Sequence, residues 1–356
     1  MFPTSTLRRS SRRHSKTGTL LDERPAGTGA WIIESYSPQG SAVFAKNPNW
    51  WGGETLLDGV EIRHFESTET QITAVEAGEI DAIQQFNVIG GEGLLNDDNF
   101  TVLTPPASTH RQVWFNTGRA QFTNKLTRQA MAWTLDRDRM VSRLFNGRAM
   151  VGNDSPVWST LPFYDPDAVE QRSRDIDRAK DLLAQAEQES VATDLHFGDV
   201  QEVPDLAQLI AQDASDAGFD VTAQLNNQGT FYADSWCPNG DGPQPCSDSS
   251  DFGIVDWGHR PVPDVFLTSA LQSNAVWNAS AYADADYGAL VIEYQGSFSV
   301  DEQKTAISKI QKKLWDDVPA IYPYFYNYLS GHRTSVANMQ STALGHSILT
   351  KASKEA

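Results

Sequence analysis

The stretch LHFGDVQEVPDLAQLIAQDASDAGFDVTAQL, residues 195–225, decides the fold class of this chain. Its apolar ends predict short strands over 195–197 and 219–225. Between them we expect a helix that starts at Pro204, where proline suits the first turn, and stops at Gly218. A strand, a helix and a strand in this order form a βαβ unit, which predicts a partly parallel sheet and an α/β fold.

Strand-like and helix-like segments alternate along the rest of the chain. The clearest is a helix whose start is marked by the capping box of Ser299 and Glu302 and whose end is marked by Pro319. Residues 226–250 are expected to form a loop. We also predict strands at 30–36, 42–45, 60–65, 80–86, 252–257 and 322–328, and helices at 68–77, 125–135, 136–147 and 178–186.

The length and charge of the chain exclude several classes of protein. Its 356 residues favour two globular lobes. The 28 basic and 46 acidic residues give a net charge of −18, and the first 24 residues hold six of the basic ones but only two acidic ones. The remaining body therefore carries −22, which repels nucleic acid and anionic lipid, so we expect neither as a partner.

Residues 1–26 are set apart by their basic side chains, among them Arg8, Arg12 and Lys16. They resemble the basic front of a secretion signal, but no apolar core follows, and no run of the chain approaches the roughly 18 apolar residues that a membrane span needs. We predict a disordered basic tail that does not direct export by a standard signal.

The two cysteines, Cys237 and Cys246, lie in one Pro- and Gly-rich stretch without a histidine. Their spacing does not suit zinc, so we expect a single local disulfide, which would indicate an oxidising compartment. Two free thiols are the alternative.

Catalytic motifs are not found in the sequence. It has no G-x-S-x-G, no phosphate-binding loop and no H-E-x-x-H, and Gly91-Glu92-Gly93 lacks the third glycine of a dinucleotide site. We therefore expect no catalytic residue, metal or cofactor. Carboxylate pairs such as Asp316-Asp317 leave an acidic-cleft hydrolase as the competing hypothesis.

Aromatic residues alternate with polar ones in three places, at 114–116, at 231–236 and at 257–260. Flat rings with nearby amide or guanidinium groups are the usual lining of a small-molecule cleft. Ordinary core packing is the alternative interpretation of each tryptophan.

Seven collinear segments resemble the solute-binding proteins that serve peptide and oligopeptide ABC transporters, the family 5 or dipeptide/nickel type. Among them, Gly27-Thr28-Gly29 is similar to the family's G-T-G turn, and Trp257-Gly258 is similar to its W-G-x-D region. The full set comprises 27–31, 47–53, 76–81, 115–137, 177–183, 257–264 and 319–326.

The resemblance implies a two-lobed, periplasmic-binding-protein-like fold of type II (cluster C) with mixed sheets. Residues 27–107 plus 325–356 would form lobe I and 108–324 lobe II, with 1–26 outside the family pattern and hinges near 107–110 and 322–326. Family members carry a leader and further strands before the G-T-G turn. We therefore expect lobe I to be incomplete and the chain to be truncated, and an inactive fragment is an alternative.

By the same resemblance the protein is a binder without turnover. It would be extracytoplasmic and monomeric, would bind a peptide first and other small solutes second, and would deliver them to an ABC permease. Arg260 stands where peptide binders have an aspartate that meets the peptide's amino end, which favours an anionic group instead. A solvated loop arginine is the alternative interpretation of Arg260, and Asp264 could substitute for that aspartate. The ligand-lining residues that the resemblance implies are Gln84, Gln85, Phe86, His110, Arg111, Trp114, Trp236, Trp257, His259, Arg260 and Asp264.

Overall fold

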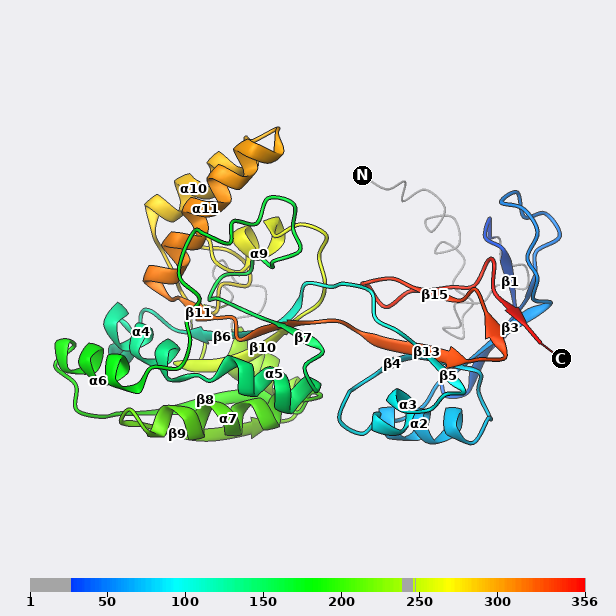
Figure 1. Ribbon diagram of the computed structural model, residues 1–356, viewed down its shortest axis with the longest axis horizontal. Helices are drawn as coiled ribbons and strands as arrows, with labels where there is room; N and C mark the ends of the chain where they lie inside the picture. The colour runs from blue at the N-terminus through cyan, green and yellow to red at the C-terminus, as the bar shows by residue number, and fades with distance from the viewer. Residues whose placement is uncertain (1–26, 239–245, 247, 356) are drawn as a thin grey trace, which may run out of the picture. The chain divides into compact units, whose positions relative to one another are not determined.

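The computed structural model describes residues 27–238, 246 and 248–355, so the predicted basic tail 1–26 lies outside the described residues. The chain divides into two compact units (Figure 1). Unit 1 comprises Met1–Pro105 and Leu329–Ala356, and unit 2 comprises Pro106–Tyr328. The chain therefore passes from one unit to the other twice.

The predicted βαβ unit is confirmed in unit 2. Strand β8 (Val191–Gly198) pairs in parallel with β9 (Phe219–Asn226), and helix α7 (Val203–Ser215) connects them. The helix buries a stripe that includes Leu206, Ile210 and Ala214. Apolar residues at this spacing share one face of a helix, which explains why α7 lies against the sheet.

The sheet of unit 2 is mixed, in the order β7-β12-β6-β10-β8-β9, and β11 also pairs with β6. β10 (Phe252–Trp257) runs parallel to β8 and antiparallel to β6 (Thr109–Phe115). Every residue of β6 is buried, because this central strand has neighbours on both edges and covered faces. The remaining strands of this sheet are β7 (Ala149–Val151), β11 (Ala320–Ile321) and β12 (Tyr324–Tyr326).

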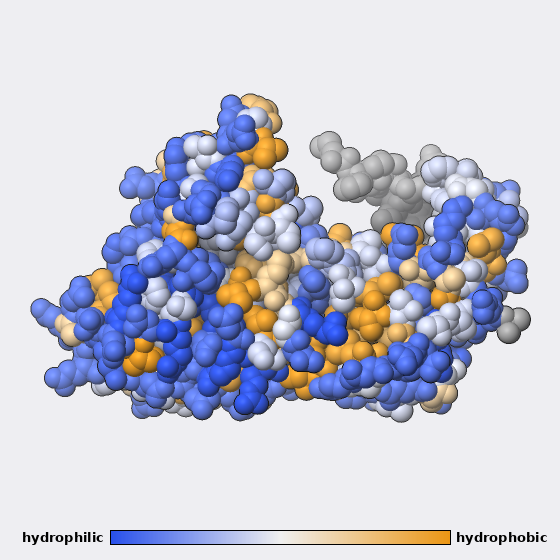
Figure 2. Space-filling model, in the orientation of Figure 1, coloured by the Kyte–Doolittle hydropathy of each residue, from blue (hydrophilic) through white to orange (hydrophobic). Residues whose placement is uncertain are grey.

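Helix α11 (Val300–Asp317) begins as predicted, because both hydrogen bonds of the capping box between Ser299 and Glu302 are present. It lies beside α10 (Ala285–Gln295), and the free end of this pair carries an apolar patch of Ile292, Phe298 and Val300 (Figure 2). The other helices of unit 2 are η1 (Ala120–Phe122), α4 (Lys125–Thr134), α5 (Arg137–Phe145), α6 (Ile176–Gln185), α8 (Gln228–Thr230), η2 (Phe231–Trp236) and α9 (Asp264–Ser269).

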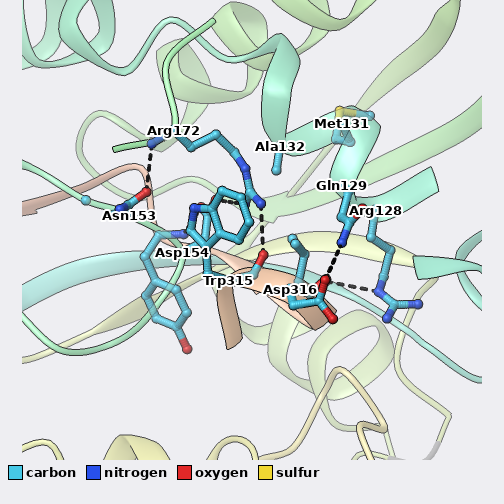
Figure 3. Close-up of polar contacts among 12 residues, drawn as sticks. Arg128, Gln129, Met131, Ala132, Asn153, Asp154, Arg172, Trp315 and Asp316 are labelled. Carbon is cyan, nitrogen blue, oxygen red and sulfur yellow. Dashed lines mark hydrogen bonds and ion pairs between the residues drawn. The ribbon is translucent and has the colours of Figure 1, made fainter. Parts of the chain in front are cut away.

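A buried carboxylate, Asp154, joins two buried arginines in unit 2, Arg137 and Arg172. Figure 3 shows Asp154 with Arg172. Arg137 Nη2 donates to both oxygens of Asp154 at 2.8 and 2.9 Å, and Arg172 Nη1 donates to Oδ2. The Arg172 guanidinium also lies over the rings of Trp133 and Trp315, 5.1 and 4.3 Å from their centroids. Asp154 thus fixes the segment that precedes α6 against α5 and α11.

Unit 1 is built from small sheets. One is antiparallel, in the order β1-β2-β3, and a second, β4-β13-β5, places β13 between two earlier strands. Its strands are β1 (Trp31–Tyr36), β2 (Ser41–Lys46), β3 (Gly59–Arg63), β4 (Ala82–Phe86), β5 (Phe100–Leu103), β13 (Leu329–Arg333), β14 (Val336–Ala337), β15 (Gln340–Ser341), β16 (Ser347–Ile348) and β17 (Ser353–Lys354). Its helices are α2 (Thr68–Glu76) and α3 (Glu92–Leu95).

Within the described ranges, no helix combines the length and apolar character that crossing a membrane requires.

Candidate functional site

Four aromatic side chains of unit 2 form what we call the tryptophan surface: Tyr232, Trp236, Trp257 and Trp277. Trp257 lies at the carboxyl end of β10 and is only 6% exposed. Its ring contacts Trp236 and Trp277 edge to face, with centroids 6.4 and 5.7 Å apart, and Tyr232 contacts Trp236 at 5.4 Å. The outer three rings are partly buried, so each keeps some surface in solvent.

Hydrogen bonding fixes Trp257 at the centre of this surface. Its Nε1 donates to Gln112 Oε1 at 2.8 Å, and Gln112 in turn donates to the Tyr322 hydroxyl at 3.0 Å. A buried indole with its N–H satisfied is a stable element of a core. Trp257 therefore supports the surface more than it contributes area to it.

Tyr232 and Trp236 are carried by η2, a π-helical turn inside the stretch that we predicted to be a loop. The prediction of an unbroken loop over 226–250 is therefore wrong, and Asn227 caps the short helix α8 that leads into η2. The π turn includes a bond from the Cys237 N–H to the Tyr232 carbonyl at 3.4 Å. Cys237 and Cys246 form a disulfide, with their Cα atoms 4.0 Å apart.

The loop after β10 is fastened to the start of β6 through Ser108. The Ser108 N–H donates to Nδ1 of His259 at 3.0 Å, its Oγ donates to the Arg260 carbonyl at 2.9 Å, and the Arg260 N–H donates to that Oγ at 3.0 Å. Since Nδ1 of His259 accepts from a backbone N–H, the proton of a neutral ring resides on Nε2. The side chains of His259 and Arg260 are partly exposed.

Arg260 supplies a positive charge in the loop after β10, three residues beyond Trp257. Its Nη1 donates to the carbonyls of Gly258 and His259 at 3.3 and 2.9 Å, and no carboxylate of the described residues pairs with it. Burial, with the positive charge of Arg260 second, lowers the pKa of His259. The guanidinium therefore has donors available for an anionic group.

The acidic group that contacts the tryptophan surface, Asp256, is bonded to Tyr232. The Tyr232 hydroxyl donates to Asp256 Oδ1 at 2.6 Å. Burial and, after it, this hydrogen bond raise the pKa of Tyr232. The hydroxyl therefore stays protonated and keeps Asp256 in place.

Three of the predicted ligand residues, all on β6, are enclosed in unit 2 and lie behind the surface rather than on it. Arg111 is 1% exposed, and its guanidinium donates to both carboxylate oxygens of Glu202 at 2.9 and 3.0 Å. His110 is surrounded by aromatic rings, with its Nδ1 2.7 Å from the Ser108 carbonyl, and Trp114 Nε1 donates to the Ser250 carbonyl at 3.0 Å. All three side chains are at most 1% exposed, which leaves them no surface for a solute in this conformation, although Nε2 of His110 has no hydrogen-bond partner among the described residues.

The other predicted residues fall into two groups. Gln84, Gln85 and Phe86 belong to β4 of unit 1, where Phe86 is buried and Gln84 Nε2 donates to the Gly345 carbonyl at 2.7 Å. Asp264 begins α9 in unit 2 and accepts from Gln295 Nε2 at 2.9 Å. Trp236, Trp257, His259 and Arg260 are the predicted residues that share one region of unit 2.

Residues that the prediction did not include complete this region. Tyr232 stood in an aromatic cluster of the sequence but not among the ligand residues, and Trp277 lies outside every family-like segment. Ser108 has no motif that would reveal its role. Over the described ranges, no cluster of three or more His, Cys, Asp or Glu side chains is arranged to hold a metal ion.

Comparison with known proteins gives a family match and distant relatives. The model for bacterial extracellular solute-binding proteins, family 5 Middle, matches residues 5–264, starting inside the basic segment 1–26. Heme-binding protein A of Haemophilus influenzae is 25% identical over 310 residues, covering 85% of this chain and 54% of that protein. The nickel-binding periplasmic protein of Escherichia coli is 24% identical, covering 69% of this chain and 48% of that protein.

Solved structures share the fold. AppA from Clostridium difficile, described as a peptide binding protein, superposes with a TM-score of 0.81 at 19% identity, covering 93% of this chain and 68% of that chain. The fold is therefore the α/β, two-lobed fold of periplasmic binding proteins, with mixed sheets as predicted. The chain spans about half the length of the curated relatives it matches.

Proposed function

Because the chain belongs to the bacterial extracellular solute-binding proteins of family 5, a family of binding proteins and not of enzymes, we propose that it binds a peptide or similar small organic solute without turnover. The observation that carries this proposal is the tryptophan surface together with Arg260, which follows Trp257 by three residues and has no acidic partner among the described residues. A peptide is the first candidate solute, and a metal complex or another small solute is second.

The rings of the surface suit the apolar part of such a solute. Tyr232, Trp236 and Trp277 are partly exposed, and edge-to-face contacts between Tyr232 and Trp236 and from Trp236 and Trp277 to Trp257 keep them ordered before a solute arrives. Preordered rings give contact area at little cost in conformational entropy. The surface therefore has the composition of a small-molecule site, apolar walls with a few fixed polar groups.

Arg260 suits a carboxylate on the same solute. In a chain of net charge −18, an arginine without an acidic partner among the described residues is a selective contact for anions. Ser108 fixes the backbone on both sides of it, so little ordering is needed on binding. A charge-assisted hydrogen bond of this kind contributes about 1.5–3 kcal/mol.

The place of action and the partners follow from the family and from the disulfide. A disulfide between Cys237 and Cys246 persists in an oxidising compartment, which agrees with an extracytoplasmic protein. We propose that the protein acts there as a monomer, passes its solute to the permease of an ABC importer, and has no nucleic-acid partner.

Calorimetric titration with a defined panel tests the proposal. The panel is Ala-Phe-Ala, hemin and nickel(II)-histidine, and each mixture is also analysed for chemical change of the solute. We expect one solute to bind in a 1:1 ratio and to remain intact, with Arg260→Gln lowering its affinity about tenfold, the equivalent of about 1.4 kcal/mol. Arg143→Gln, which removes an exposed arginine of α5, is the matched control and should bind as the parent does.

Two results would contradict the proposal. One is a parent chain that binds no member of the panel at millimolar concentration, and the other is turnover of a solute. If Arg260→Gln and Arg143→Gln lose the same affinity, the role assigned to Arg260 is refuted, but the proposal of solute binding is not.

A further inference from the structure

The disulfide lies next to both flanking tryptophans of the tryptophan surface. Cys237 directly follows Trp236, and Sγ of Cys246 lies 3.3 Å from the carbonyl oxygen of Val276, the residue before Trp277. Both half-cystines are buried, 9% and 2% exposed, within the core of unit 2. One covalent bridge thus ties the segment that carries Trp236 to Cys246, whose sulfur packs against the backbone of the segment that carries Trp277.

The Trp236 side of this bridge is held by the hydrogen bond from the Tyr232 hydroxyl to Asp256 at 2.6 Å, but its backbone has few bonds to other segments. η2 is a π-helical turn, a rare form that occurs mostly at functional sites. The bond from the Cys237 N–H to the Tyr232 carbonyl is long, at 3.4 Å, and the Ser250 N–H adds one bond to the Ser235 carbonyl at 2.8 Å. A single turn with such bonding needs a tertiary restraint to persist.

The Trp277 side is held firmly. The Trp277 N–H donates to the Ser269 carbonyl at 2.9 Å, and the side chain of Asn278 donates to the carbonyls of Gln272 and Tyr282 at 2.9 and 2.8 Å. These bonds anchor the 276–278 segment to α9 and to the chain that leads into α10. The disulfide therefore fastens the π turn to Cys246, whose sulfur packs against this strongly bonded segment.

We propose that the Cys237–Cys246 disulfide is a positioning device for solute recognition, which holds the π turn so that Tyr232 and Trp236 lie against Trp257 in the orientation that contacts the solute. The inference rests on the proposed function for its solute, but the positioning of Trp236 is observable without one. Cys237 and Cys246 themselves need not touch the solute.

Fluorine NMR of the chain labelled with 5-fluorotryptophan tests the positioning. Trp236→Phe identifies the Trp236 resonance, and Trp133→Phe identifies that of a buried ring on α4 that packs against Trp315. In the double variant Cys237→Ser/Cys246→Ser we expect the Trp236 resonance to shift and broaden while that of Trp133 stays in place. An unchanged Trp236 resonance would overturn the proposal.

Titration with Ala-Phe-Ala tests recognition. We expect the double variant to lose at least tenfold in affinity while its circular dichroism remains that of a folded chain. Ser299→Ala is the control, because it weakens the start of α11 in the same unit without touching the π turn, and it should keep the parent affinity. A displaced Trp236 resonance together with parent affinity would also overturn the proposal.

Failure of the proposed function has a different signature. If the parent chain does not bind Ala-Phe-Ala, the peptide part of that function fails, and the Trp236 resonance alone decides whether the disulfide positions the turn.

Discussion

Asp154→Asn measures how much of the stability of unit 2 depends on one buried carboxylate. Asp154 has a left-handed backbone, with φ at 58°, and asparagine is among the residues that adopt this conformation readily. The substitution therefore keeps the shape and the backbone of the site, removes its charge and replaces one acceptor oxygen by an NH2 donor. Arg137 and Arg172 would remain buried, with side chains 2% and 0% exposed and no anion between them.

The expected loss of unfolding free energy in Asp154→Asn follows from the charges of the three side chains. The three side chains now carry a net charge of +1, and the variant raises this to +2 in the same enclosed volume. Removing one partner of a buried ion pair costs about 3–5 kcal/mol, because the other charge is left uncompensated. For a unit of this size we expect Tm to fall by about 10 °C.

Urea unfolding followed by far-ultraviolet circular dichroism measures the loss of unfolding free energy. The control is Glu170→Gln, which breaks the exposed ion pair between Glu170 and Arg178 and should cost less than about 1 kcal/mol. A loss for Asp154→Asn within 1 kcal/mol of that control would refute the reasoning, since the stacking of Arg172 on Trp133 and Trp315 would then suffice to hold it.

Three further predictions concern the same unit. Burial lowers the pKa of His110 from 6.5 to about 3. Between these two pH values His110 is protonated in the unfolded chain but neutral in the folded chain. The free energy of unfolding should therefore decrease as pH falls from 6.5 to 3, by up to about 5 kcal/mol. His110→Asn, which can still donate to the Ser108 carbonyl, should reduce that decline in acid-unfolding curves, and an unchanged slope would show that carboxylates account for it. Ser299→Ala should lower the unfolding free energy by about 1 kcal/mol and Ser299→Asp should restore it, and equal values for both would argue against the capping box. Removing the disulfide, which closes a loop of ten residues, should cost about 2.5 kcal/mol in the chain-entropy description, measured by urea unfolding with and without reductant.

Local patterns predicted much of unit 2. The βαβ unit and the capping box could be predicted from the sequence because each depends on residues a few positions apart. Examples are Pro204 at the start of α7 and Ser299 with Glu302. Helix α10 was missed because Gly288 and β-branched residues weaken its intrinsic propensity. Its buried residues Tyr287, Val291 and Tyr294 form the helix by packing, which a single segment does not reveal.

The candidate site was predicted only in part because its decisive contacts are not local. Arginine is a common ligand contact, but the Nε and Nη2 donors of Arg111 both bond the carboxylate of Glu202, which is 91 residues away in the sequence. The π turn has no sequence signature, since its bonds span five residues with no preferred side chains. The unpaired state of Arg260 likewise depends on which carboxylates the fold brings near it.

The hydrogen bonds of Ser108 have a mechanical consequence. The chain enters unit 2 at Pro106, and two residues later Ser108 is bonded to the backbone of Arg260 in both directions and to the ring of His259. An anion that pulls on the Arg260 guanidinium would therefore transmit force, through Ser108, to the segment by which the chain enters unit 2.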